Sequence, residues 1–267
     1  MPLPFLIRHW KKELQVFHEN LLILQKSSDT EAIHDIRVSI KKLRSYTKLF
    51  SEVFDKDPKK HLTETKNLFS ILGRQRNIEI SVELLDHFKA IGSHSPIQKH
   101  FEFYLDETKQ RSISALHQYK GEGLRSLTIE IEKTVSTTDE ESIKPGLVKL
   151  MRSSVTDIKR ELKNFDKNFH LIRKRLKDVF YWNEILPEGF YFSKQELKQF
   201  KMILTDLGDS QDHEVLRSGL KHCRRTVVAK GSSEYDKAKK LEDGAIKNKQ
   251  NALGSAGKMV KAVFKKK

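Results

Sequence analysis

The sequence predicts an all-α fold in which two similar helical bundles follow each other along the chain, at residues 1–138 and 139–267. Amphipathic helical periodicity runs through almost the whole chain, and no convincing alternation typical of a β-strand interrupts it. Gly and Pro account for only 12 and 6 of the 267 residues, so few positions break a helix. A segment of the first half also returns in the second half, which indicates an internal duplication.

The repeated segment is a helix in which basic residues follow a histidine. Residues 34–50 read HDIRVSIKKLRSYTKLF, and residues 170–186 read HLIRKRLKDVFYWNEIL. In both copies basic residues stand three and seven positions after the histidine, and these spacings place the three side chains on one helical face. The two triplets are His34, Arg37 and Lys41, and His170, Arg173 and Lys177. Apolar residues repeat in the same register, pairing Ile36 with Ile172, Ile40 with Leu176, Leu43 with Val179 and Leu49 with Ile185.

A second element repeats at nearly the same offset from each histidine helix. Leu72-Gly73 is followed by Asn77 in the first half, and Leu207-Gly208 is followed by Asp212 in the second. The duplicated unit is therefore several helices long.

Capping residues, prolines and glycines divide each half into helices. Asp29 or Thr30 is the expected N-cap of the first histidine helix, and Lys144-Pro145-Gly146 is expected to open the second half. In the first half we expect helices at about residues 5–26, 31–54, 60–72, 76–90, 97–120 and 124–136. In the second half we expect them at about residues 146–166, 168–186, 193–206, 210–229 and 233–262, the last forming a C-terminal helix.

Composition limits the class of partner. The chain has 51 Lys and Arg against 36 Asp and Glu, a formal net charge of +15 and a pI near 9.6. Nucleic acid, anionic lipid and inorganic polyphosphate are the candidate polyanions, and the alternative is a basic protein whose lysines are merely solvated. The apolar runs are far too short to span a membrane, so no membrane insertion is expected. A single cysteine, Cys223, excludes an internal disulfide, and the N-terminal segment lacks a secretory pattern, so we expect a cytoplasmic protein.

The first histidine helix closely resembles the signature helix of a known family. His34-x-x-Arg37-Val38-x-x-Lys41-Lys42-Leu43-Arg44 is similar to that of the CHAD domain, and the resemblance covers nearly the whole chain. It implies a duplication of two four-helix bundles with a basic groove or pore between them, and it implies polyphosphate binding. The second half departs from the family pattern, because Asp178 stands in place of one of a basic pair and Phe180 in place of an arginine.

Polyphosphate has a charged backbone and no bases, so a binder needs a track of cations, with arginine as a planar fork and lysine as a mobile charge. The predicted polyphosphate-binding residues on the two histidine helices are His34, Arg37, Lys41, Lys42, Arg44, Lys48, His170, Arg173, Lys174 and Lys177. Four further candidates are added from their positions on the first helix of each half, namely Arg8, Lys12, Arg152 and Lys159.

Other interpretations of these residues stay open at this point. The histidines could pack between helices rather than contact phosphate, and Lys48 could belong to a solvated face. Arg74 and Arg76 stand at a predicted helix start, where backbone amides favour anions, but we interpret them as loop charges.

Two other functional classes compete with polyphosphate binding. A nucleic-acid binder is expected to interleave aromatic residues with its cations, whereas here Phe and Tyr mostly follow the core register. A metal-dependent phosphohydrolase would need metal ligands on one helical face, and no His-x-x-x-His or Glu-x-x-His pair accompanies the repeat. We therefore expect a non-catalytic binding protein without cofactor or metal, associated with polyphosphate granules. The sequence leaves its oligomeric state open.

Overall fold

The computed structural model of the protein describes residues 4–27, 29–88 and 95–265, and within these ranges every regular element is a helix. The all-α prediction is confirmed. The elements are α1 (Pro4–Leu24), α2 (Thr30–Phe54), the 3₁₀ helix η1 (Pro58–Leu62), α3 (Thr63–His87), α4 (Pro96–Gln118), α5 (Glu122–Ser136), α6 (Glu140–Glu161), the 3₁₀ helix η2 (Leu162–Asn164), α7 (Phe165–Ile185), α8 (Lys194–Thr226) and α9 (Ser233–Lys265).

The two histidine helices are α2 and α7, and both have the expected apolar register. Asp29 is the N-cap of α2, and its carboxylate accepts a hydrogen bond of 2.9 Å from the backbone amide of Ala32. The repeated apolar pairs, for example Ile36 with Ile172, are buried on both helices. The adjacent stripe of each helix therefore carries the cations, as the repeat predicts.

The structure corrects two predicted breaks. We expected helices to end at residues 72 and 206, but α3 and α8 run unbroken past Gly73 and Gly208. The reason is visible at Gly73, where an added Cβ would lie 2.6 Å from Nη1 of Arg37. Because Gly73 has no side chain, the guanidinium of Arg37 from α2 can lie directly against the backbone of α3, and the helix continues through the glycine. The last two residues of the predicted helix 76–90 lie outside the described residues.

A third correction concerns the start of the second half. We expected a helix to begin at about residue 146, but α6 begins at Glu140 and contains Pro145 in its second turn. Ile143 and Leu147, on either side of this proline, are both buried in the core. Their burial outweighs the backbone hydrogen bond that the proline cannot donate.

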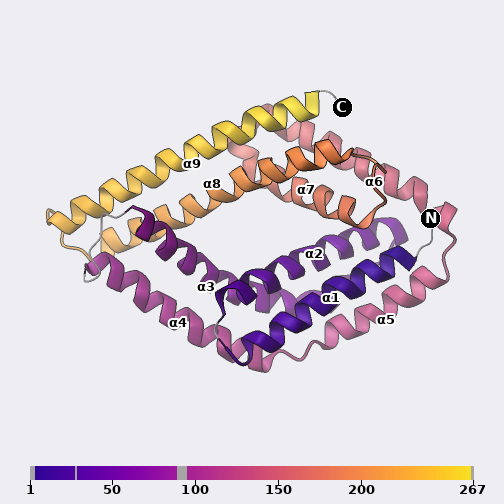
Figure 1. Cartoon of the computed structure of the whole chain (residues 1–267), viewed down its shortest axis with the longest axis horizontal. Helices are drawn as coiled ribbons and strands as arrows, with labels where there is room; N and C mark the ends of the chain where they lie inside the picture. The colour runs from indigo at the N-terminus through magenta and orange to yellow at the C-terminus, as the bar shows by residue number, and fades with distance from the viewer. Residues whose placement is uncertain (1–3, 28, 89–94, 266–267) are drawn as a thin grey trace.

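The apolar side chains form two clusters, and each cluster combines residues from both halves of the chain. The larger one draws on all nine α-helices of the described chain. The smaller one lies where the α3–α4 and α8–α9 hairpins converge, and Leu85, Phe101, Leu216 and Leu241 belong to it (Figure 1). The division at residue 138 is therefore not a division of the cores, and it stays a prediction from the sequence.

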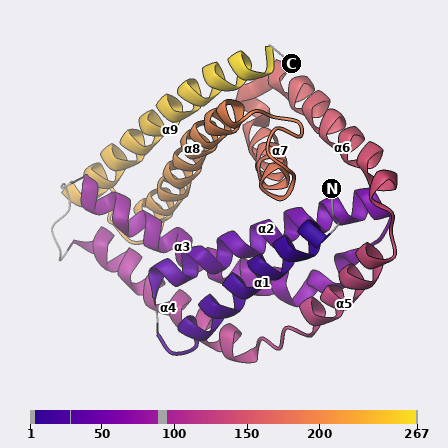
Figure 2. The same ribbon diagram turned by 45° about the vertical axis from the view of Figure 1, so that its right-hand side comes forward.

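Polar residues separate the two clusters along α3 and α8. Leu72 and Leu207 belong to the larger cluster, and Leu85 and Leu216 to the smaller one. We call the intervening residues 73–79 of α3 and 208–214 of α8 the polar belt. Polar side chains of the belt are buried, namely Gln75, Glu79 and Ser210. α3 packs against α8 and α2, and α7 packs against α8 and α2 (Figure 2). Arg37 of α2 approaches Gly73 and Arg173 of α7 approaches Gly208, so the four helices meet at the polar belt.

Candidate functional site: four facing cations

Four basic side chains of the histidine helices meet between α2 and α7. Arg37 and Lys41 come from α2, and Arg173 and Lys177 come from α7, which packs against α2. Lys41 is close enough to Lys177, Arg37 and Arg173 for all three charges to act on it. We call these four residues the central cations. The positive stripes of the two histidine helices therefore face each other, as the repeat predicts.

Burial and mutual repulsion make the charged state of the central lysines unfavourable. Desolvation is the largest cause, and together with Lys177, Arg37 and Arg173 it lowers the pKa of Lys41 to about 7. Desolvation and Arg173 likewise lower the pKa of Lys177 to about 8, although Asp212 opposes the shift. At pH 7, Lys41 is thus only about half protonated in the ligand-free protein, whereas Lys177 is mostly protonated and loses its proton near pH 8.

The central cations lack close carboxylate partners. In the part of the chain that the structure describes, no carboxylate oxygen lies within 4.0 Å of a side-chain nitrogen of Lys41, Arg173 or Lys177. The Nε of Arg173 is buried and has no hydrogen-bond acceptor. The four central cations are half-buried, and half-buried cations without close partners cost free energy, so an anion between them is favoured.

Arg37 is held in place by a backbone carbonyl and a phenyl ring. Its Nη1 donates a hydrogen bond of 2.9 Å to the carbonyl of Phe69, and its guanidinium carbon lies 4.5 Å from the centre of the Phe69 ring. The guanidinium carbon of Arg44 lies 5.3 Å from the centre of the same ring, so both arginines contact Phe69. These contacts fix the guanidinium of Arg37 but leave most of its donors free for an anion.

Two carboxylates of the polar belt act on the central cations: Glu79 stabilises the charged form of Arg37, and Asp212 acts on the other three. Asp212 stabilises the charged forms of Arg173, Lys41 and Lys177, although it forms no close ion pair with them. Desolvation raises the pKa of Asp212, and the nearby carboxylate of Asp209 raises it further. The spacing shared by Gly73 with Asn77 and by Gly208 with Asp212 singled out this position in the sequence, but we did not include it among the site residues.

Arg76 belongs to the site, and its interpretation as a loop charge is wrong. It lies within α3, in the polar belt, because Gly73 does not end the helix. Its Nη1 lies 3.4 Å from Glu79 Oε2 and 3.0 Å from Glu83 Oε1. Its charge contributes to the lowered pKa of Arg37, after desolvation. The repeat gave no signal for Arg76, because Gln211 stands at the equivalent position three residues after Gly208.

His34 and His170 are exposed, so the structure does not support the alternative that they pack in the interior. Desolvation, followed by the charge of Lys41, lowers the pKa of His34. Desolvation, followed by Lys249 and Arg173, lowers the pKa of His170. Both imidazoles are therefore neutral near pH 7 and gain charge when an anion approaches.

Other predicted residues on the histidine helices are partly neutralised. Lys42 Nζ lies 3.1 Å from Glu13 Oε1 and 3.3 Å from Glu184 Oε2. Lys48 Nζ lies 2.7 Å from Asp178 Oδ2, in an ion pair between α2 and α7. Lys174 is exposed beside His170, which it influences electrostatically. Lys42 and Lys48 thus lie along the same helix as the central cations, but each already has an acidic partner.

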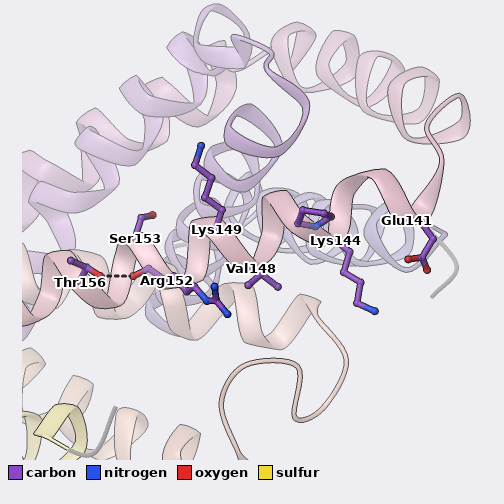
Figure 3. A pocket seen from close by; sticks show the side chains of 8 residues that line it. Glu141, Lys144, Val148, Lys149, Arg152, Ser153 and Thr156 are labelled. Atoms are coloured by element: carbon purple, nitrogen blue, oxygen red, sulfur yellow. Dashed lines mark hydrogen bonds between the residues drawn. The ribbon is translucent and has the colours of Figure 1, made fainter.

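The four flanking candidates lie apart from the central cations. Arg8 and Lys12 line a hollow formed by α1, and Arg152 lines a second hollow whose described residues all belong to α6 (Figure 3). Lys159 is exposed near the end of α6. None of these four is among the charges that shift the pKa of a central cation.

Two negative findings concern other kinds of site. Among the described residues, no group of three or more His, Cys, Asp or Glu side chains could hold a metal ion. Among the same residues, no helix has the length and apolar character needed to cross a bilayer.

The fold and the site together define a class of all-α domains in which two histidine-bearing helices face each other through four cations. The sequence profile of the CHAD domain matches residues 8–221, so the chain belongs to the CHAD domain family. A similar solved structure is the crystal structure of the CHAD domain from the plant Ricinus communis, with a TM-score of 0.75 and 15% identity over 99% of this chain and 91% of that chain. At this identity the similarity establishes the fold alone. No curated protein sequence matches the chain.

Proposed function

We propose that this protein binds inorganic polyphosphate at the central cations and does not turn it over. The observation that carries the proposal is the meeting of Arg37, Lys41, Arg173 and Lys177, of which the last three have no carboxylate within 4.0 Å in the described chain. A polyanion with closely spaced charges relieves the repulsion among these side chains. The link between the CHAD family and polyphosphate binding supports this choice of anion.

Nucleic acid is the alternative ligand, and the surroundings of the site argue against it. Binding of single strands relies on aromatic rings that stack with bases. Phe69 lies beside the central cations, and the guanidinium carbons of Arg37 and Arg44 lie 4.5 Å and 5.3 Å from its ring centre. The Phe69 ring is therefore already engaged by guanidinium groups, which leaves nucleic acid chiefly its backbone charge for binding.

The test is a double substitution, Arg37→Ala with Arg173→Ala, measured by titration with long-chain polyphosphate. Loss of two charge-assisted contacts should weaken binding by about 100-fold or more and make it less sensitive to salt. The matched control is Arg8→Ala with Arg152→Ala, which removes the same charge far from the central cations. Equal losses in both double variants would show that binding reflects net charge and not this site.

Two further measurements separate the alternatives. Single-stranded RNA of equal charge should displace polyphosphate only at a much higher concentration, and displacement at equal concentration would contradict the choice of ligand. Incubation with polyphosphate should release no orthophosphate, because we propose binding without catalysis. Cytoplasmic location and association with polyphosphate granules stay predictions.

A further inference from the structure

A cavity of about 680 Å³ lies where α7, α8 and α9 meet, beyond the histidine of α7. Its wall includes Phe169 of α7, Glu214 and Arg217 of α8, and Lys249 of α9, with Asp166 also lining it. The family profile ends at residue 221, so Lys249 lies on a helix that the profile does not reach. The four ionisable side chains of the wall are balanced in charge, which means that the cavity itself attracts no anion in the ligand-free protein.

The carboxylate of Glu214 forms ion pairs with both Arg217 and Lys249, and the pair with Arg217 alone is enough to neutralise it. Arg217 donates to both oxygens of Glu214, with Nε 2.9 Å from Oε2 and Nη2 2.6 Å from Oε1. Lys249 Nζ adds a third contact, 3.0 Å from Oε2. The hydrogen bond from Arg217 is the largest cause that lowers the pKa of Glu214 to about 2. Because this bidentate pair already satisfies the carboxylate, Lys249 can leave without exposing an unpaired charge.

His170 connects this cavity with the central cations. The charges of Lys249 and Arg173 both act on its imidazole, so His170 lies near both side chains. Its ring lies 3.9 Å from that of Phe169, and Lys249 Nζ lies 5.6 Å from the same Phe169 ring. Along α7, the seven residues from Lys177 to His170 span roughly 10 Å. A chain that leaves the central cations along α7 therefore passes His170 and then reaches Lys249.

We infer that His170 and Lys249 form a second phosphate subsite, which receives the part of a long polyphosphate chain that extends beyond the central cations. This inference rests on the proposed function. When the chain arrives, Lys249 swings from Glu214 to a phosphate oxygen, and Arg217 stays behind to neutralise Glu214. The central cations hold the chain close by, so the high effective concentration of its free end compensates for the balanced charge of the cavity. Tripolyphosphate occupies only the central cations and does not reach the subsite.

The experiment compares long-chain polyphosphate with tripolyphosphate on Lys249→Ala. We expect this variant to bind the long chain about tenfold more weakly, as for the loss of one charge-assisted contact, and to bind tripolyphosphate as the unmodified protein does. The matched control is Lys247→Ala, which removes an exposed lysine from the same helix and should leave the long-chain affinity within about twofold.

A second variant tests the role of Glu214. Glu214→Gln weakens the hold on Lys249, so it should raise the affinity for the long chain several-fold, and this gain should vanish when Lys249→Ala is added. Equal long-chain affinities of the Lys249→Ala and Lys247→Ala variants overturn the subsite while leaving the central site intact. Failure of the unmodified protein to bind either ligand overturns the proposed function as well.

Discussion

Raising the pH from 7 to 9 should weaken polyphosphate binding, because the central lysines lose their protons. The pKa of Lys41 is about 7 and that of Lys177 about 8 in the ligand-free protein, with desolvation as the largest cause of both shifts. A bound polyanion favours the charged forms and returns both pKa values toward the ordinary lysine value of 10.5. Above pH 7 to 8, each lysine must therefore take up a proton when the ligand binds, and affinity falls as pH rises.

The size of the effect follows from the two pKa values. Each pH unit above the pKa of a lysine costs up to about 1.4 kcal/mol of binding free energy. At pH 9, Lys41 lies two pH units above its pKa of about 7 and Lys177 one above its pKa of about 8, which sets a ceiling of about 4 kcal/mol. Partial solvent contact of both side chains reduces this ceiling, and we expect a loss of roughly 100-fold between pH 7 and pH 9.

The assay is calorimetric titration with polyphosphate at pH 8 in buffers of different ionisation enthalpy. It should register the uptake of about one proton on binding, since both lysines are then partly deprotonated in the free protein. The control is Lys41→Arg with Lys177→Arg, because arginine stays charged at pH 9 and should flatten the pH profile. Equal affinity at both pH values, with no proton uptake, would refute the argument that buried, repelling lysines form the site.

Two further predictions concern stability. Lys41→Met should raise the free energy of unfolding of the ligand-free protein by about 1 kcal/mol while weakening polyphosphate binding, since it replaces a half-buried cation without a close partner by an apolar chain of similar size. Urea unfolding measures this free energy, and a Lys41→Met variant less stable than the unmodified protein would contradict the prediction. Gly123→Ala should cost about 3 kcal/mol, because its Cβ would lie 2.1 Å from the backbone oxygen of His61. Gly254→Ala, with nothing within 4 Å of its Cβ, is the control and should be neutral or slightly stabilising in thermal unfolding.

The sequence predicted the parts of the structure that local periodicity determines. The helical class, the N-cap at Asp29 and the apolar register of Ile36 and Ile172 all follow from spacing along one helix, and all are confirmed. The facing of Arg37 and Arg173 was also predictable, because a repeated stripe suggests a shared environment.

Tertiary contacts account for what the sequence did not predict. Glycine usually weakens a helix, so Gly73 was interpreted as a break, but the partner that needs its missing Cβ comes from another helix. The acidic partners of Lys48 and Lys249, namely Asp178 and Glu214, are far away in sequence. No local pattern distinguishes a lysine that meets a distant carboxylate from one that meets another cation.

The continuity of α3 and α8 has a consequence for recognition. Both helices pass through the polar belt without interruption and are anchored in an apolar cluster at either end. Arg37 and Arg173 lie against Gly73 and Gly208 of these two helices, so the proposed central site is preorganised and should lose little conformational entropy on association. Most of the conformational entropy lost on binding then comes from a flexible polymer ligand, so we expect the stiffness of the ligand, as well as its charge, to determine the affinity.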